Sequence, residues 1–492
     1  MSQLILILLL GGAVAGWSER LGRQFPPWVA LIVLLAASLQ FLSSVAPVLD
    51  QATGTTQVTW LLEERTEWIS RFGIGFHLAM DGMSVLLVAL TLLLGCVAVV
   101  SSWSEIQHKP GFFQANLLWT LAGTVGVFLA IDLFLFFVFW EVMLVPMYLL
   151  IAIWGHEDRA RAALKFFIFT QASGLLMLLA ILVTAVAYHQ QTGEWSFLYT
   201  DWLQHPLTGS LATWAFFGFL LAFLVKLPAF PVHSWLPDAH TQAPTAGSVI
   251  LAGVLLKTGA YGLLRFGVAL FPAAAQDYAD AMLIVGVAGI LYGAVLALGQ
   301  EDFKRLVAYS SVSHMGFVLL GIFAWNPMAW SGAVLQMVAH GLSTAALFMV
   351  AGALQQRLHS RQFSDMGGLW KAMPRMGAVA MFFVIASVGM PGLGNFMAEF
   401  MILAGLFKVW PLLCGVAAVA LVTGAVYGLW LLQRAFHGPL ASTSQNLVDL
   451  HARDMTAFAV LALGLLWLGL YPQPFIDLMT PTLNAIAKLA GG

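Results

Sequence analysis

The stretch FLLAFLVKLPAFPVHSWLPDAH, residues 219–240, places a lysine at the end of an apolar run and follows it with three prolines. An ionisable side chain inside a bilayer is costly unless it is paired or hydrated. Proline removes a backbone donor and clashes with the preceding turn, so a helix that reaches Lys226 must break just beyond it. Non-helical backbone survives at membrane depth only where protein buries it or where it lines a wet cavity. The stretch therefore predicts a membrane helix that is interrupted beside a buried, functional cation.

The rest of the chain has the composition of a membrane protein. Of its 492 residues, 60% are hydrophobic and only 9% are charged. Apolar runs of about 20 residues can cross a bilayer as helices, and the chain contains about fourteen of them. This pattern predicts an all-α polytopic membrane protein without a separate soluble domain. The approximate bounds of the runs are 2–17, 28–49, 78–102, 114–131, 133–154, 164–187, 211–231, 245–270, 280–299, 304–323, 330–354, 376–405, 410–434 and 455–471.

The basic residues are distributed unevenly between the two sides of the predicted bundle. The connections after spans 1, 3, 5, 9, 11 and 13 contain 14 of the 21 basic residues; the opposite side, with both termini, contains 4, and 3 lie inside spans. By the positive-inside rule the richer side is cytoplasmic, so both termini are expected to face outward. The first run lacks a preceding basic segment, which favours a membrane span over a signal peptide. The 14 residues are Arg20, Arg23, Lys109, Arg159, Arg161, Lys165, Lys304, Arg305, Arg357, Arg361, Lys371, Arg375, Arg434 and Arg453.

A second interruption occurs in the twelfth run, in SVGMPGLGNFMAEF at 387–400. Pro391 and the two glycines that follow it are expected to unwind the helix just before Glu399. Broken helices at corresponding positions of two halves indicate a transport site built from inverted repeats. The second break therefore resembles the first, with a carboxylate in place of the ammonium.

A single offset relates the buried ionisable groups of the two halves. Lys226 and Glu399 are 173 residues apart, and the same offset joins Glu141 to His314. With five spans in each repeat, an odd number, the second repeat would enter the membrane upside down relative to the first. The predicted units are an N-terminal group of helices over 1–112, repeats over 113–270 and 271–435, and a C-terminal loop and helix over 436–492.

The first repeat contains two candidate proton carriers, Lys226 and Lys257. Buried lysines can exchange protons near neutral pH, whereas arginine stays charged. Glu141, in LFLFFVFWEVMLVPMYLL at 133–150, is expected to pair with Lys226 and to control its protonation, the alternative being a purely structural ion pair. Arg265 lies near the outer end of its span, where snorkelling to the interface is expected.

The second repeat contains two histidines on adjacent spans and one buried carboxylate. His314 and His340 can accept a proton on one ring nitrogen while donating from the other, which suits a relay. The alternative is that each is a structural hydrogen-bonding group. No third or fourth ligand lies beside them in the sequence, which argues against a metal site. Glu399 is expected to be the terminal proton carrier on the outer side.

Other polar residues near the span ends have two readings. His233, Asp238 and His240 could load protons at the cytoplasmic mouth or cap helices. Asp81, Asp132 and Lys408 are expected to be interfacial anchors. The two cysteines, Cys96 and Cys414, are far apart, and iron–sulfur clusters need several thiolates at set spacings. No haem or dinucleotide motif is found, so the sequence predicts no cofactor in this chain.

Four segments resemble one family closely, in the same order and over almost the whole chain. The segments are FWEVMLVPMYLLIAIWGHEDRARAALKFFIFTQASG at 139–174, KLPAFPVHSWLPDAHTQAPTAGSVILAGVLLKTGAYGLLR at 226–265, EDFKRLVAYSSVSHMG at 301–316 and GMPGLGNFMAEF at 389–400. They are similar to the antiporter-like membrane subunits of bacterial NADH:quinone oxidoreductase, respiratory complex I, of the subunit M type. Related subunits usually have lysine at the position of Glu399, so glutamate favours that type.

The resemblance implies a fold of fourteen helices with two inverted five-helix repeats, and a proton-pumping role in the membrane arm. It implies that flavin, iron–sulfur clusters and quinone belong to partner subunits, and that neighbouring antiporter-like subunits are the partners in a bacterial inner membrane. The alternatives are a subunit of a multi-subunit cation/proton antiporter and a structural scaffold, which leaves the buried charges unexplained. The implied roles are a coupling pair of Glu141 and Lys226, a central Lys257, connecting histidines His314 and His340, and an exit carboxylate at Glu399.

Overall fold

Apart from one β-hairpin, helices dominate the computed structural model, which describes residues 1–49, 60–439 and 447–491. Thirteen helical stretches in these residues are long and apolar enough to cross a membrane, and two shorter apolar helices occupy the predicted twelfth run. The all-α membrane architecture is therefore confirmed. Twelve of these stretches are the helices α1 (Ser2–Ser18), α2 (Phe25–Leu49), α3 (Gly82–Ser102), α4 (Pro110–Leu129), α5 (Leu133–Trp154), α6 (Arg159–Thr192), α8 (Gly209–Lys226), α13 (Ala279–Leu298), α14 (Phe303–Phe323), α15 (Pro327–Leu358), α19 (Pro411–Phe436) and α20 (Ala452–Leu470). The thirteenth is the composite stretch Thr245–Val268, and a further helix, α21 (Gln473–Gly491), ends the described chain.

A β-hairpin follows the second helix, in the polar interval between the second and third predicted runs, which contains Glu63, Glu64, Arg65 and Glu67. Strand β1 (Leu62–Ile69) pairs antiparallel with β2 (Ile74–Met80). The predicted third run begins too early, at 78, because the helix starts only at Gly82. The Asp81 carboxylate accepts a hydrogen bond from the backbone N–H of Ser84 at 3.0 Å and caps this helix. Residues 50–59 of the polar interval lie outside the described part of the chain.

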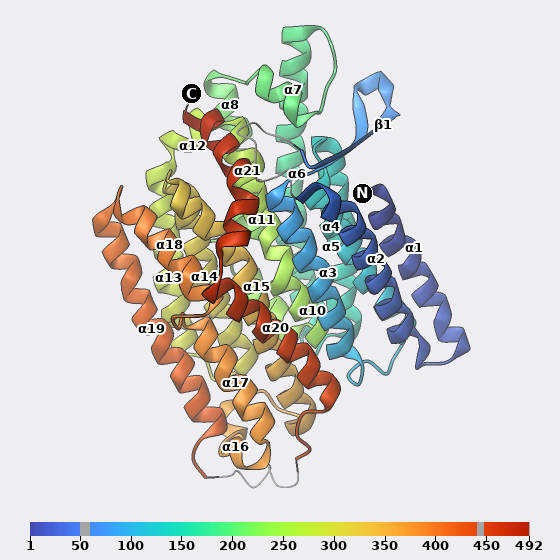
Figure 1. Cartoon of the computed structure of the whole chain (residues 1–492), viewed down its shortest axis with the longest axis vertical. Coiled ribbons are helices and arrows are strands. Elements are labelled where there is room, and N and C mark those ends of the chain that lie inside the picture. The colour runs from blue at the N-terminus through green and yellow to red at the C-terminus, as the bar shows by residue number, and fades with distance from the viewer. Residues whose placement is uncertain (50–59, 440–446, 492) are drawn as a thin grey trace.

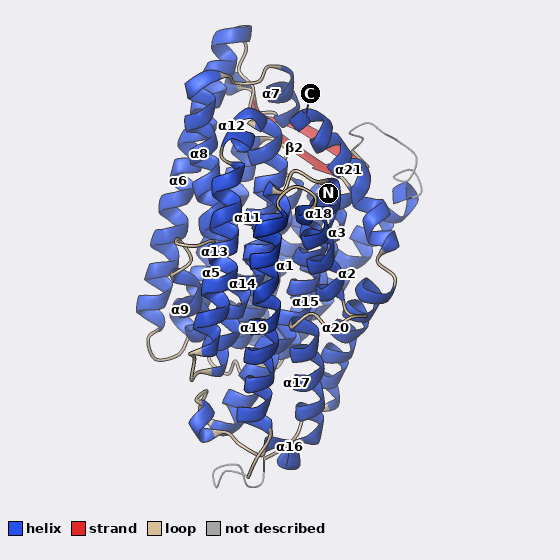
Figure 2. Ribbon diagram, turned by 90° about the vertical axis from the view of Figure 1, so that its left-hand side faces the viewer, coloured by secondary structure: helices blue, strands red, loops and turns tan. Residues whose placement is uncertain are grey.

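The two ends of the bundle differ in composition. The hairpin, the short helices α7 (Tyr199–Gln204) and α12 (Pro272–Asp277) and both chain ends lie toward one end, called here the hairpin end (Figure 1). The short helix α16 (Leu369–Ala372) marks the opposite end (Figure 2), called the basic end because its connections include Arg159, Lys304 and Arg361. Both termini therefore lie away from the basic connections, as the charge distribution predicts.

Both predicted helix breaks are present. Helix α8 ends at Lys226, and the chain becomes helical again only at α9 (Trp235–Gln242), whose Trp235 side chain donates to the backbone oxygen of Val225 at 2.9 Å. Helix α17 (Pro374–Ser387) is followed by a non-helical turn before α18 (Gly394–Phe407). Gly389 and Gly392 in that turn have φ values of 81° and 93°, which glycine adopts at no steric cost.

The eighth span has an irregularity that the sequence did not predict. It runs from α10 (Thr245–Ile250) through the π-helical segment η3 (Leu251–Leu255) to α11 (Leu256–Gly262) and a second π-helical segment, η4 (Leu263–Val268). Such π segments inside α-helices occur frequently at functional sites. This span is completely buried, and α14, α15 and α4 are almost so, whereas less than a third of α2 and of α20 is buried. The eighth span, α14 and α15 therefore lie in the core.

Candidate functional site

Lys226 lies at the last residue of α8, directly before the break, and is completely buried. Its ammonium nitrogen lies 5.1 Å from the ring centroid of Trp140 and 5.7 Å from that of Phe166. These distances are within the range of cation–π interaction. The Nζ atom has no hydrogen-bond partner among the described residues. The lysine is therefore held by aromatic faces and is not neutralised by a contacting carboxylate.

Glu141 follows Trp140 on α5 and is half-buried. Glu141 and Lys226 are not among the ion pairs within 4 Å of the described residues, and Glu141 Oε1 has no hydrogen-bond partner there. The carboxylate is nevertheless near enough to interact with Lys226 through its field. The two charges therefore interact without direct contact.

Lys257 occupies the centre of the core, on α11 between the two π segments. It is completely buried, and its Nζ lies 2.8 Å from Nδ1 of His340 on α15. The same nitrogen donates to the backbone oxygen of Ala252 in η3. A π turn leaves carbonyl groups outside the regular helical pattern, so η3 supplies an acceptor that an unbroken α-helix would not. Lys257 and His340, which the sequence analysis names as candidate proton carriers, are thus in direct contact.

His314 and Glu399 form a second buried contact. His314 Nδ1 on α14 lies 2.9 Å from Glu399 Oε1 on α18, beyond the second helix break. Both side chains are less than about a tenth exposed. The rings of His314 and His340 are 5.6 Å apart between centroids. Lys257, the two histidines and Glu399 therefore form a series of titratable groups on four helices, with one gap between the histidine rings.

Three polar side chains complete this series and were missed from the sequence. The Gln336 side chain donates from Nε2 to Glu399 Oε1 at 2.9 Å. Nε2 of His314 lies 3.3 Å from the Ser387 hydroxyl and 3.5 Å from that of Tyr427. Gln336 could have been found, because it lies four residues before His340 on the same helix face. Ser387 and Tyr427 come from distant helices, and nothing in the sequence joins them to the histidine.

Arg265 is the clearest error of the sequence analysis. Snorkelling would expose its guanidinium, but the side chain is 1% exposed and forms an ion pair with Asp81. The guanidinium also lies 5.2 Å from the Trp60 ring centroid and 5.5 Å from that of Tyr261. Asp81 is buried as well, so it is not an interfacial anchor. The pair joins η4 to the start of α3 at the hairpin end.

Other predicted anchors and loop residues also have structural partners. Asp132 is buried, caps α5 through the Leu135 N–H and accepts from the Gly75 N–H of the hairpin at 2.9 Å. Asp238 on α9 pairs with Lys165 at 2.7 Å and Arg305 at 3.3 Å. These two carboxylates fix helices. Lys408 is exposed, as expected of an anchor.

His233 lies in the non-helical segment after α8, and His240 lies on α9. The His233 ring packs against the Tyr292 ring at 5.1 Å between centroids. The His240 ring is completely buried and stacks on Phe348 at 4.4 Å, and neither of its nitrogens has a hydrogen-bond partner in the described residues. Neither ring caps a helix, so that predicted alternative is wrong for the two histidines.

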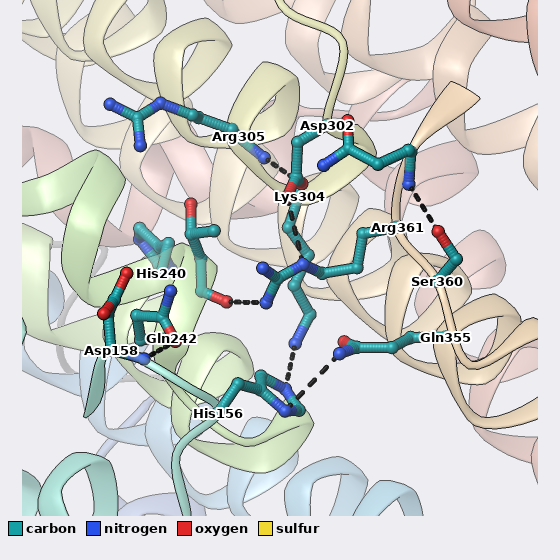
Figure 3. Close-up of polar contacts among 12 residues, drawn as sticks. His156, Asp158, His240, Gln242, Asp302, Lys304, Arg305, Gln355, Ser360 and Arg361 are labelled. Atoms are coloured by element: carbon teal, nitrogen blue, oxygen red, sulfur yellow. Dashed lines mark hydrogen bonds and ion pairs between the residues drawn. The ribbon is translucent and has the colours of Figure 1, made fainter. Parts of the chain in front are cut away.

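A polar network at the basic end joins the two halves (Figure 3). His156 Nε2, in the connection after α5, lies 3.3 Å from Lys304 Nζ of α14. Arg361 pairs with Asp302 at 3.0 Å and donates to the backbone oxygen of Thr241 at 2.7 Å. Burial lowers the pKa of His156 to about 3, and the nearby Lys304 and Arg361 charges add to the effect. The imidazole is therefore neutral at physiological pH and can accept from Lys304.

The described residues contain no group of three or more histidine, cysteine, aspartate or glutamate side chains that could hold a metal ion. The buried series itself consists of ammonium, imidazole and carboxylate groups, which can exchange protons.

Comparison with known proteins identifies the class of protein to which this fold belongs. A family model described as "NADH:quinone oxidoreductase/Mrp antiporter, TM" matches residues 130–425. A chain of respiratory complex I from Thermus thermophilus with bound NADH is 30% identical, with a TM-score of 0.88 and coverage of 99% of this chain and 100% of that one. A chain of the Mrp complex from Dietzia sp. DQ12-45-1b is 21% identical with a TM-score of 0.83, which shows a shared fold.

Curated relatives identify the family within this class of membrane proteins. NADH-quinone oxidoreductase subunit M of Escherichia coli K12 is 50% identical over 484 residues, covering 96% of this chain and 95% of the relative. The subunit M of Pseudomonas aeruginosa is also 50% identical, over 497 residues, covering 99% and 97%. The chain therefore belongs to the NADH-quinone oxidoreductase subunit M family of antiporter-like, proton-translocating membrane subunits. This confirms the resemblance seen in the sequence.

Proposed function

We propose that Lys257, His340, His314 and Glu399 carry protons through the core, and that Lys226 delivers them under the control of Glu141. The observation that carries this proposal is the series of contacts from Lys257 Nζ to His340 Nδ1, at 2.8 Å, and from His314 Nδ1 to Glu399 Oε1, at 2.9 Å. A fixed structural network would not need four titratable groups in sequence inside a membrane.

Each titratable side chain in the series carries out one proton transfer. The ammonium of Lys257 can give a proton to His340 Nδ1, because the two nitrogens are within hydrogen-bond distance. An imidazole that receives a proton on one nitrogen can release another from its second nitrogen. The 5.6 Å between the histidine ring centroids requires ring rotation or an intervening water. Glu399 then takes the proton from His314 and releases it beyond the second helix break.

Glu141 is placed to couple this series to a neighbouring subunit. It is the one charged residue lining a depression of about 620 Å³ that opens at the surface of the bundle, with Trp119, Phe137 and Pro146 among its walls. A charged group of a neighbouring subunit could draw the carboxylate away from Lys226. The loss of its field would favour proton release from the lysine.

The remaining expectations complete the proposal. The chain acts in respiratory complex I beside other antiporter-like subunits, and flavin, iron–sulfur clusters and quinone belong to partner subunits. Redox chemistry there drives the charge movement at Glu141. The units 113–270 and 271–435 act as inverted repeats, each with its own broken helix.

Replacing Lys226 with alanine should reduce proton translocation about 100-fold, the scale of one essential proton-transfer group. Glu141→Gln should reduce it about tenfold, as expected when one coupling interaction is lost. The measurements are NADH:quinone activity and the proton gradient in vesicles that contain the assembled complex. Lys408→Ala removes an exposed lysine and is the matched control. Near-normal activity and gradient in an assembled Lys226 variant would contradict the proposed role.

The proposed topology places the connection with Arg159 and Arg161 in the cytoplasm of a bacterial inner membrane and both termini on the periplasmic side. Single cysteines at the exposed positions Ala160 and Lys488, in a background without Cys96 and Cys414, report the two sides. On intact cells with a permeabilised outer membrane, a membrane-impermeant maleimide should label Lys488→Cys and miss Ala160→Cys. Opening the inner membrane should expose both. The reverse labelling pattern would overturn the assignment.

A further inference from the structure

The second repeat contains a buried amide that the proton-carrying series does not use. Asn395 lies in the first turn of α18 and is completely buried. Neither its amide nitrogen nor its amide oxygen has a hydrogen-bond partner among the described residues. Burial of a polar group without a partner is unfavourable, and native proteins rarely leave one unsatisfied. Asn395 therefore indicates a polar partner inside the bundle.

Asn395 faces the same way as Glu399. The two residues are four apart on α18, and residues at this spacing share one face of a helix. On this face Glu399 contacts His314 of α14 and Gln336 of α15. Helices α14, α15 and α18 also pack against one another (Figure 1). The Asn395 amide therefore points toward the interface of these three helices, one turn closer to the second helix break than Glu399.

The packing of α15 against α18 brings Asn395 near His340. The two helices approach closely, because a Cβ atom added at Gly394 would lie 3.2 Å from the Cβ atom of Ala339. Asn395 directly follows Gly394 and His340 directly follows Ala339. The two polar side chains therefore start from neighbouring points of the same interface.

His340 and Gln336 also have unsatisfied atoms there. Nδ1 of His340 lies 2.8 Å from the Lys257 ammonium nitrogen, and a neutral imidazole that accepts at Nδ1 carries its proton at Nε2. This Nε2 has no partner among the described residues, and neither has Oε1 of Gln336, one turn earlier on α15. Together with the Asn395 amide, the interface thus contains two buried donors, the His340 Nε2 and Asn395 Nδ2 atoms, and two buried acceptors, the Gln336 and Asn395 oxygens.

Water matches this set of donors and acceptors. A water molecule has two hydrogens to donate and two lone pairs to accept. Buried water typically makes about three hydrogen bonds to polar groups that lack other partners. A metal ion would leave both donors unsatisfied, because it binds acceptor atoms only.

We propose that Asn395 positions buried water that carries protons from His340 to Glu399. The inference rests on the proposed function and adds a positioning residue to it. His340 receives a proton on Nδ1 from Lys257 and releases the proton of Nε2 to this water, which passes a proton to the Glu399 carboxylate. Lys257 becomes a neutral amine and Glu399 a carboxylic acid, so the protons balance. The water connects the series across the 5.6 Å between the histidine ring centroids without rotation of either ring.

The test compares two substitutions of Asn395 in vesicles that contain the assembled complex. Asn395→Leu has a similar volume but cannot hold water, and should lower proton translocation about tenfold, the effect of losing the hydrogen bonds that fix the water. Asn395→Ser keeps a donor and an acceptor and leaves room for water, so it should retain most of the translocation. NADH:quinone turnover in heavy water should slow more in the leucine variant than in wild type, because proton transfer then limits the rate.

Asn116→Leu is the matched control. It removes a completely buried asparagine from α4, whose amide nitrogen donates to the backbone oxygen of Phe112 at 2.7 Å and which supplies no member of the series. It should leave translocation and the solvent isotope effect unchanged. Equal losses in the leucine and serine variants of Asn395, with the isotope effect of wild type, would show a merely structural role and overturn the proposal.

A map of the assembled wild-type complex by high-resolution electron cryomicroscopy gives an independent test. It should show water within hydrogen-bond distance of the Asn395 amide and of Nε2 of His340. A dry interface would overturn the proposal even if the leucine variant failed to assemble. Normal translocation by Asn395→Leu, beside a loss in Glu399→Gln, would overturn the role of Asn395 and leave the proposed function standing. Full translocation by Glu399→Gln would overturn the proposed function itself.

Discussion

Replacing Glu399 with glutamine is expected to lower proton translocation about 100-fold, because an amide keeps the shape of the carboxylate but cannot release a proton. The variant should still fold. Glutamine can accept from Gln336 and contact His314 as the carboxylate does at 2.9 Å. The measurement is the proton gradient in vesicles with verified assembly of the complex. Full pumping by the glutamine variant would show that Glu399 need not titrate.

Two further variants separate proton transfer from charge pairing. Glu399→Asp keeps the chemistry with a shorter reach and should retain part of the activity. Glu399→Lys reverses the charge, which a purely electrostatic partner would not tolerate. The structure can accommodate a lysine at this position. Oε1 of Gln336 has no partner among the described residues, and rotation of the Gln336 amide would turn this oxygen toward the new ammonium group. Proton translocation is expected to be highest in wild type, lower in the aspartate and lysine variants, and lowest in the glutamine variant. Glu301→Gln, at an exposed carboxylate, is the control.

The second large effect is on stability, at the buried pair of Arg265 and Asp81. Asp81→Asn keeps the helix cap, since asparagine caps as well as aspartate, but leaves Arg265 as an uncompensated buried charge. The expected loss in free energy of unfolding is about 3–5 kcal/mol. Arg265→Leu leaves the buried carboxylate instead and should cost a similar amount. The double variant should recover most of the loss, because no unpaired charge remains.

The measurement for this pair is a double-mutant cycle on thermal unfolding of the purified complex in detergent. Pairing Asp238→Asn with Lys165→Ala, at a partly exposed ion pair of 2.7 Å, provides a control that should show a coupling below about 1 kcal/mol. Additive losses at Asp81 and Arg265 would mean that the two charges do not stabilise each other.

The sequence predicted the elements that depend on composition and on proline. The spans, the breaks after Lys226 and before Glu399, and the membrane class follow from hydrophobic length and from backbone chemistry that acts locally. The burial of Lys257 inside the protein could also be predicted, because a charged side chain that faces lipid has a high free-energy cost. The family resemblance ordered these residues into a path before any contact was known.

The contacts themselves could not be predicted, because they depend on how helices face each other. Arg265 lies near a span end, and sequence alone does not distinguish a lipid-facing position there from a protein-facing one. Its partner Asp81 lies 184 residues away on another helix. The contact of Lys257 with His340 joins residues 83 apart. The aromatic rings around Lys226 depend on side-chain packing that no spacing rule describes.

The two π-helical segments on either side of Lys257 make the eighth span sensitive to the place at which its length changes. Each π turn contains one residue more than an α turn, and neighbouring residues on an α-helix are rotated by about 100°. Deleting one residue from Leu251–Leu255 would convert that turn to α-helix and leave Lys257 facing the same way. Deleting one residue from the α-helical start of the span, Thr245–Ile250, while the π turns persist would rotate Lys257 relative to the preceding residues by about this angle, so that the ammonium faces away from His340. This span can therefore exchange one apolar side chain for another far more readily than it can gain or lose a residue outside its π turns.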